Sequence, residues 1–168
     1  MIARLVHGID TLSELVGKAV SWLLVVLIAE VFYDVVMRYA FSAPTVWSYD
    51  VSYMLGGAVI LMASAWVLKR GEHISMDVIS QRFTVRTRLV LDVVFLIAVF
   101  FPLTYVLMEQ SLRMTMISVM NNETSSVSFW RPVYWPFRIA ISAGLVLLLA
   151  QGVSNLIRKC YALLGREL

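Results

Sequence analysis

The sequence predicts an all-α integral membrane protein with four transmembrane helices. Hydrophobic residues account for 60% of its 168 residues, and charged residues for only 15%. A soluble domain carries about a quarter charged residues, so this chain cannot cover its own apolar surface with charge. Its apolar residues also gather in runs of about 18 to 20, the length of helix that crosses a hydrocarbon layer of ~30 Å. Composition and run length together therefore indicate a membrane-spanning fold.

Four such runs form one expected membrane domain that covers residues 1–168. Pro102 interrupts the third run, and a proline inside a helix predicts a kink there. The longest connection is expected between Arg113 and Pro136, where a cluster of aromatic residues suits the membrane–water boundary. The expected spans cover residues of about 18–39, 49–68, 89–110 and 133–156.

Residues 1–17 precede the first expected span and have an amphipathic pattern. Apolar residues such as Leu5 and Leu12 recur at helical spacing, whereas Asp10 and Ser13 fall on other faces of the same helix. A helix of this kind suits the membrane surface or the side of a partner helix. The same residues fit equally well a plain cytoplasmic extension of the first span, so both interpretations stay open.

Lys and Arg residues are distributed unevenly around the expected spans. Ten of the 14 lie before the first span, between the second and third, or after the fourth. An excess of these residues marks cytoplasmic loops, so both termini are expected in the cytoplasm. The net charge of +3 then needs no nucleic-acid partner. The four on the opposite side are Arg38, Arg113, Arg131 and Arg138.

The first expected span contains two acids at membrane depth. Glu30, Asp34 and Arg38 stand at i, i+4 spacing and share one stripe of the helix. Ionisable groups inside a membrane are costly and face protein or water, which makes them functional candidates. One hypothesis is a proton or cation site, and the other is an ion-pair ladder turned towards a protein partner. The ladder is favoured for Asp34, whereas Glu30 lies deeper and stays open.

No motif for catalysis or for holding a cofactor stands out in the sequence. His7 and His73 both lie outside the apolar runs, which disfavours a haem held between two histidines. The lone Cys160 excludes an intrachain disulfide and a multi-cysteine metal site. The polar stretch Trp66–Asp77, WVLKRGEHISMD, is expected to form a capped cytoplasmic turn that faces a partner, with Gly71 ending the helix before it. Neither enzyme activity nor a cofactor is expected.

Three segments share a pattern with a known family: DVVMRYAF at residues 34–41, Trp47 followed by Asp50, and GEHISMD at 71–77. They resemble the small membrane subunit, or Q-type subunit, of tripartite ATP-independent periplasmic (TRAP) transporters. The segments NETSSV and PFRIAISAGLVLLLAQG also fit that family's last loop and last span. Carried over position by position, the matching residues are Arg38, Trp47, Asp50, Gly71, Glu72, His73 and Asp77.

The resemblance implies a non-catalytic subunit in the bacterial inner membrane. Its partners would be a large multi-span membrane subunit, which holds the sodium and substrate sites and moves like an elevator, and a soluble periplasmic protein that captures an organic acid. The small subunit would brace the fixed scaffold and help to dock the binding protein. The matching residues are then structural or interface groups rather than substrate ligands.

Two other classes of membrane protein compete with this interpretation. A self-sufficient small proton-coupled antiporter would use one buried acid, for which Glu30 is the candidate. Such chains are shorter and have no block like the GEH of residues 71–73. A membrane anchor for a redox enzyme is the second alternative, and the positions of the two histidines disfavour it.

Overall fold

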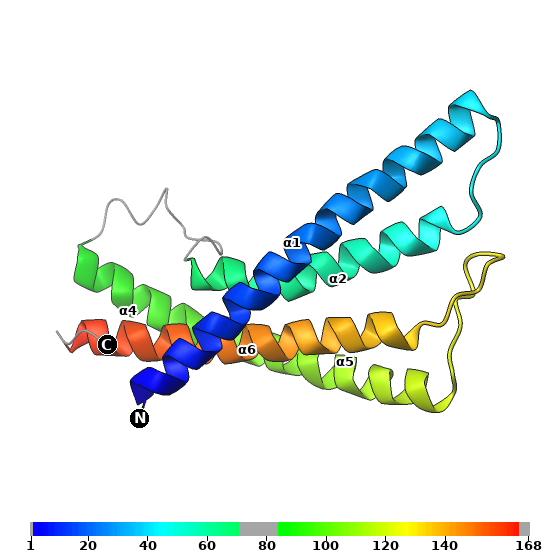
Figure 1. Ribbon diagram of the computed structural model, residues 1–168. Coiled ribbons are helices and arrows are strands. Elements are labelled where there is room, and N and C mark those ends of the chain that lie inside the picture. Colours follow the sequence, from blue (N-terminus) through cyan, green and yellow to red (C-terminus); the bar gives the residue numbers. More distant parts are fainter. Residues whose placement is uncertain (1, 71–83, 165–168) are drawn as a thin grey trace.

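The computed structural model describes residues 2–70 and 84–164, and most of them are helical (Figure 1). Four helical segments are long and apolar enough to cross a membrane, which confirms the expected number of spans. The most apolar 18-residue windows of these segments have mean hydropathies between 1.8 and 2.4. Within the described ranges the only β-type pairing is an isolated bridge between Thr124 and Val133. The chain is therefore an all-helical, multi-pass membrane protein.

Helix α1 runs without a break over Ile2–Ala40, 39 residues in all. The N-terminal segment expected before the first span is thus part of the same helix. Its buried face carries Asp10 and Ser13 together with Val6, whereas Leu5 and Leu12 are exposed. The side of this segment that packs on the rest of the protein therefore includes polar residues, and the outward side includes apolar ones.

Helix α2 covers Ser48–Lys69 and returns beside α1. The turn between them bends at Ser42, which takes a left-handed φ of 50°. At the other end of α2, the guanidinium of Arg70 lies 4.2 Å from the centre of the Trp66 ring. This cation–π contact holds the last turn of the helix.

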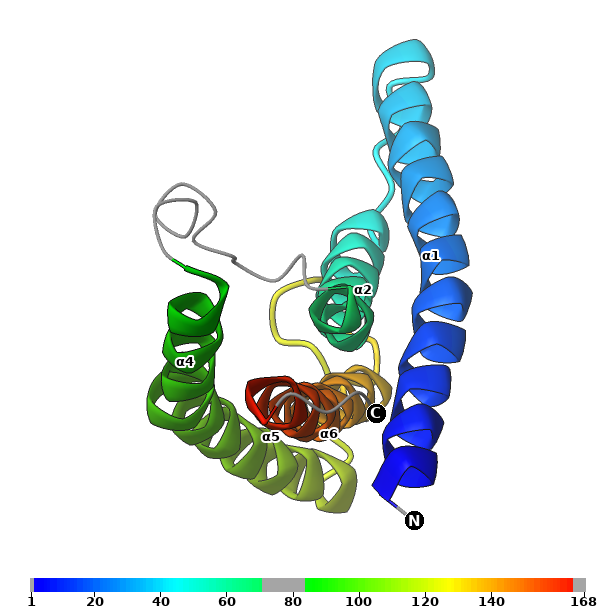
Figure 2. The same cartoon turned by 90° about the vertical axis from the view of Figure 1, so that its left-hand side faces the viewer.

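The third span is built from three consecutive segments, α4 (Val85–Phe95), the π-helical turn η1 (Leu96–Phe100) and α5 (Phe101–Met120). The bend expected at Pro102 is taken up by η1, directly before that residue. Proline has no N–H, and its ring collides with the carbonyl four residues earlier, so the wider π turn relieves both conflicts. Figure 2 shows the resulting change of direction between α4 and α5.

The expected connection from Arg113 is wrong at its start, because α5 continues to Met120. The residues up to that point include neither glycine nor proline, so nothing in them stops the helix. The helix ends at Asn121–Asn122, where Asn122 adopts a left-handed φ of 48°. The connection is the shorter loop of residues 121–134.

Helix α6 (Trp135–Leu163) is the centre of the arrangement. Of its most apolar window 44% is buried, against 17% in each of the other three spans. Helices α1 and α2 lie on one side of α6 and α4–α5 on the other (Figure 2). The two termini lie at one end of the helices, and the loops of residues 41–47 and 121–134 at the opposite end (Figure 1).

Helices α2 and α6 approach closely at Gly144. A Cβ atom added there would lie 2.9 Å from the backbone carbonyl carbon of Leu61, so only glycine fits without moving α2. Towards the terminal end, Phe100 packs against Gly152 and joins a small core whose other members are Leu68, Leu96 and Leu148. Small residues at such points let membrane helices pack without a hydrophobic driving force.

Candidate functional site

Three acids near the loop end of the molecule, Glu30, Asp34 and Asp50, form the first part of the candidate site, and we call them the loop-end acids. All three were singled out in the sequence. Their side chains are buried within the bundle, with residue exposures of 9%, 8% and 1%. Each one accepts hydrogen bonds from hydroxyl groups of a neighbouring segment. Buried acids in a membrane need such partners.

Glu30 binds the first turns of α2. The Ser48 hydroxyl donates to one carboxylate oxygen at 2.5 Å, and the Ser52 hydroxyl donates to the other at 2.6 Å. No cation contacts this carboxylate in the described part of the chain. The geometry ties the middle of α1 to the start of α2.

Asp34 bonds Arg38 on its own helix, at 2.8 Å, and Thr45 across the turn. The backbone N–H of Thr45 also donates to the Asp34 carboxylate at 3.2 Å. Close by, Trp47 stacks on Tyr33 with ring centres 6.1 Å apart. The motif residues of this region therefore hold the α1–α2 turn in one conformation.

Asp50 holds the second loop. The Ser125 hydroxyl donates to one of its oxygens at 2.9 Å, and the Ser128 hydroxyl donates to the other. The same loop is closed at its base by Glu123, which accepts a 2.8 Å bond from Arg138 of α6. Side chains of the loop thus bond both the start of α2 and the start of α6, and so connect the two helices.

Acid is expected to loosen residues 121–134 only below the ordinary pKa of a glutamate. The Arg138 guanidinium holds the pKa of Glu123 below its usual value of 4.5, although partial burial acts in the opposite direction. A carboxylate with a lowered folded-state pKa stabilises the fold above the usual value, and this stability is lost as the pH falls through the folded-state pKa. A spin label at Ser126, in a Cys160→Ser background, reports the mobility of the loop.

Glu123→Gln is the control for this titration, because it removes the charge and leaves Asp50 in place. The variant loop should be more mobile at neutral pH, and less of its mobility should depend on acid. Equal titration curves for the two proteins would show that Glu123 does not hold the loop.

The remaining motif residues, Gly71, Glu72, His73 and Asp77, lie outside the described residues. The turn predicted for them stays a prediction. Of the seven matching positions, the structure therefore places Arg38, Trp47 and Asp50, and it brings all three to the loop end.

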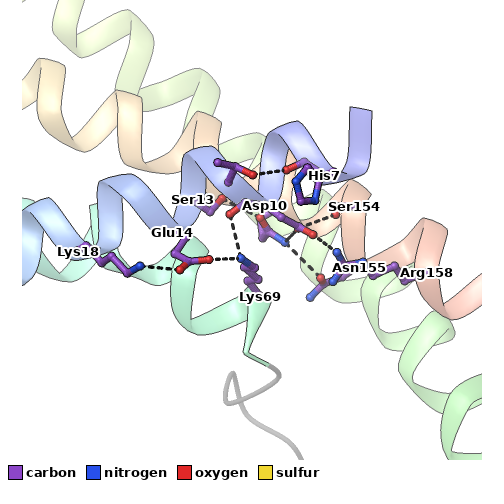
Figure 3. Close-up of polar contacts among 11 residues, drawn as sticks. His7, Asp10, Ser13, Glu14, Lys18, Lys69, Ser154, Asn155 and Arg158 are labelled. Carbon is purple, nitrogen blue, oxygen red and sulfur yellow. Dashed lines mark hydrogen bonds and ion pairs between the residues drawn. The ribbon is translucent and has the colours of Figure 1, made fainter. Parts of the chain in front are cut away.

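A second polar cluster lies at the other end of the bundle, and we call it the terminal-end network (Figure 3). Asp10 of α1, only 3% exposed, is its centre. One carboxylate oxygen accepts hydrogen bonds from Gln151 at 2.8 Å and from Ser154 at 3.0 Å, both on α6. The other oxygen forms an ion pair with Arg158, and Ser13 completes the network by donating to Gln151 at 2.7 Å.

Further contacts connect this network to α2. Lys69 donates to the Asp10 backbone carbonyl at 3.2 Å and pairs with Glu14 at 2.7 Å. Asn155 donates its amide to the Leu68 carbonyl at 2.8 Å and so satisfies one of the free carbonyls at the end of α2. Three helices are joined here through side chains that are almost all polar.

The sequence did not show that Gln151 of the last span would meet Asp10 of the N-terminal segment. The sequence does contain a signal, because polar residues three apart lie on one face of a helix. Asp10 and Ser13 have this spacing on α1, and Gln151 and Ser154 have it on α6. Matching small and polar residues on two spans is the pattern by which membrane helices pair.

The arrangement of both clusters suits rigid bracing better than chemistry. Each described acid has a hydroxyl, amide or cationic partner within the chain. No group of three or more His, Cys, Asp or Glu able to hold a metal ion occurs within residues 2–70 and 84–164.

The model of the family described as tripartite ATP-independent periplasmic transporters, DctQ component, matches residues 26–160. The chain belongs to this family. It is accordingly a small membrane subunit of a TRAP transporter. Members of the DctQ family act in tripartite transporters with a large membrane subunit and a periplasmic binding protein. A search of curated proteins found no match to the chain.

The match includes every loop-end acid but begins after the first part of α1. Asp10 and Ser13 therefore lie outside it, whereas their partners Gln151, Ser154 and Arg158 lie inside. The DctQ match therefore covers the loop-end acids and all the side chains that bond them, but it leaves out the α1 side of the terminal-end network.

Proposed function

We propose that this DctQ chain is a non-catalytic scaffold subunit of a sodium-coupled TRAP transporter for organic acids. It resides in a bacterial inner membrane as one four-span domain, with both termini in the cytoplasm. Its role is to brace the fixed part of the large elevator-type subunit and to help dock the periplasmic binding protein. Sodium and substrate bind elsewhere in the complex.

The observation that carries this proposal is that the buried acids already have hydrogen-bond or ion-pair partners within the chain. An ion-coupling carboxylate must exchange its ligand during each transport cycle, whereas both carboxylate oxygens of Asp10 and of each loop-end acid are bonded by groups of the same chain. Asp10 and Asp50, for example, each use both carboxylate oxygens. Such fully bonded acids favour a rigid bundle over a moving ion site.

The exposed apolar surface supports a role beside a large partner. On α1 the side chains of Trp22, Phe32 and Tyr39 are 73%, 68% and 80% exposed. Long apolar faces of this kind are covered by lipid or by another membrane protein. The cytoplasmic placement of the termini is supported by the excess of Lys and Arg at that end.

The motif residues divide between two proposed roles. Arg38, Trp47 and Asp50 stabilise the two loops at the periplasmic end, and these loops present the surface for the binding protein. Gly71, Glu72, His73 and Asp77 are proposed as a cytoplasmic interface with the large subunit.

Purification of the tagged chain in mild detergent from its native host tests the proposal. We expect one large polytopic protein to co-elute in near-equal amount, identified by mass spectrometry. Recovery of this chain alone, as a dimer, would contradict the scaffold role and would favour the small antiporter.

The same purification with Glu30→Ala decides the role of the acid that the sequence left open. Because Glu30 holds Ser48 and Ser52, its removal should lower the yield of the large subunit more than it changes the sodium dependence of transport by the remaining complexes. Ser64→Ala is the matched control, since its hydroxyl bonds only the Ile60 carbonyl of its own helix. Intact assembly with lost sodium coupling would instead assign Glu30 to an ion site.

A further inference from the structure

An apolar groove with a volume of 580 Å³ lies between α2 and α6 at the loop end. Its walls include Met54 and Ala58 of α2 and Ala140 of α6, and its mouth is formed by Trp130 and Arg131 of the loop. The groove therefore begins at the level of the loop and extends alongside the membrane-spanning part of both helices. Its lining is almost entirely apolar apart from the arginine.

Arg131 is unusual among the arginines at this end of the molecule. Arg38, Arg113 and Arg138 pair with Asp34, Glu109 and Glu123 respectively, at 2.8 to 3.2 Å. Arg131, in contrast, has no anionic partner among the residues that the structure describes.

The backbone at Arg131 is also held in a costly conformation, with a left-handed φ of 45°. Residues other than glycine adopt this region only where the surroundings impose it, and such positions gather at ligand clamps. Here the neighbouring backbone imposes it: Ser125 donates its N–H to the Pro132 carbonyl at 2.8 Å, and Ser125 itself is fixed by Asp50. The loop is built so that a cation stands at the mouth of the groove.

A ligand that fits both features has an anionic group and a long apolar chain. We propose that the groove binds a phospholipid of the leaflet at the loop end, with its phosphate on the Arg131 guanidinium and an acyl chain between α2 and α6. Guanidinium groups bind phosphate oxygens through two parallel hydrogen bonds. Trp130, half exposed at the same level, has the amphipathic ring that settles among lipid headgroups.

A transmembrane helix of the large subunit is the rival occupant. A helix in the groove would match its apolar walls, but it would leave the Arg131 charge unmatched unless it also carried an acid at that level, whereas every phospholipid has its phosphate there. The unpaired cation beside an apolar slot is the charge pattern of a phospholipid. This proposal does not require the large subunit, so it stands or falls separately from the scaffold role.

Native mass spectrometry of the full-length chain tests the proposal, with dioleoylphosphatidylglycerol titrated into delipidated protein in detergent. We expect one lipid to bind before all others, and Arg131→Gln should weaken that binding roughly tenfold, the effect of losing one charge-assisted contact. Arg113→Gln is the matched control, because it removes a cation at the same end outside the groove. Dioleoylglycerol, which lacks the phosphate, should bind the wild type no more tightly than it binds Arg131→Gln.

A second pair of variants fills space without changing charge. Ala140→Phe places a ring inside the groove and should reduce binding of the first lipid at least as much as Arg131→Gln, whereas Ala143→Phe, on an exposed face of the same helix, should leave it unchanged. Circular dichroism confirms that each variant remains helical. The proposal would be overturned if all four variants bound the phosphatidylglycerol equally well, or if dioleoylglycerol bound the wild type as tightly as the phosphatidylglycerol does. It would also be overturned if the complex with the large subunit held no lipid in the groove, because the rival helix would then be the occupant.

Discussion

Replacing Gly144 with leucine should force α2 and α6 apart and prevent a stable bundle. Even the first side-chain atom would lie 2.9 Å from the carbonyl carbon of Leu61 and 3.0 Å from the Met62 nitrogen, and both of these are backbone atoms. Backbone cannot rotate away as a side chain can, so the whole of α2 must shift. A single added methyl group in a packed interface costs about 1–3 kcal/mol, and leucine should exceed the upper end of this range.

The apparent unfolding temperature of the purified chain in detergent measures this effect. Gly144→Ala should lower it, and Gly144→Leu should lower it further or abolish recovery of folded protein. Gly56 provides the matched control on α2, because a Cβ atom there meets nothing within 4 Å. Gly56→Ala should be neutral or slightly stabilising, since alanine favours a helix by about 1 kcal/mol over glycine. Equal effects of the two alanine variants would show that α2 and α6 are not in close contact at Gly144.

Removing the carboxylate of Asp10 should release the first part of α1 from α6. In Asp10→Ala the side chains of Gln151 and Ser154 lose their acceptor within a buried site, and Arg158 loses its counter-charge. Breaking a fully buried pair costs about 3–5 kcal/mol. Because the Arg158 side chain is 43% exposed, water recovers part of this cost, and we expect a loss of about 2–4 kcal/mol.

Thermal unfolding and proteolysis near the N-terminus measure that loss. Asp10→Asn keeps the size of the side chain and one acceptor oxygen, so it should fall between the wild type and Asp10→Ala. Glu14→Gln is the matched control one turn away, since its ion pairs with Lys18 and Lys69 are on a more exposed side of the helix and should contribute little. An Asp10→Ala protein as stable as Glu14→Gln would contradict the role given to the terminal-end network.

Several local features could be read from the sequence because they depend on single helices. Asp34 and Arg38, four residues apart, do form an ion pair. The bend near Pro102 follows from the missing N–H of proline, although the sequence did not show that a π turn would carry it. Helix α5 ends later than the sequence predicts, because the expected connection, rich in methionine, asparagine and serine, contains no helix-breaking residue before Asn121.

The sequence did not show which face of each helix packs against the other helices. Of the glycine pair at 56 and 57, only Gly57 meets another helix, at the Phe137 ring. Residues 2–17 show the problem most clearly, because their apolar side chains Leu5 and Leu12 are exposed while Asp10 and Ser13 are buried. In water the opposite arrangement would be favoured.

The sequence by itself determined that four helices cross a membrane, since run length and hydropathy respond only to the thickness and polarity of the hydrocarbon layer. Only the tertiary structure decided which faces meet. Lipid is as apolar as leucine, so burying an apolar face gains little, whereas an unpaired polar group is costly in it. Partners such as Asp10 and Gln151, 141 residues apart, therefore set the packing, and no local pattern connects them.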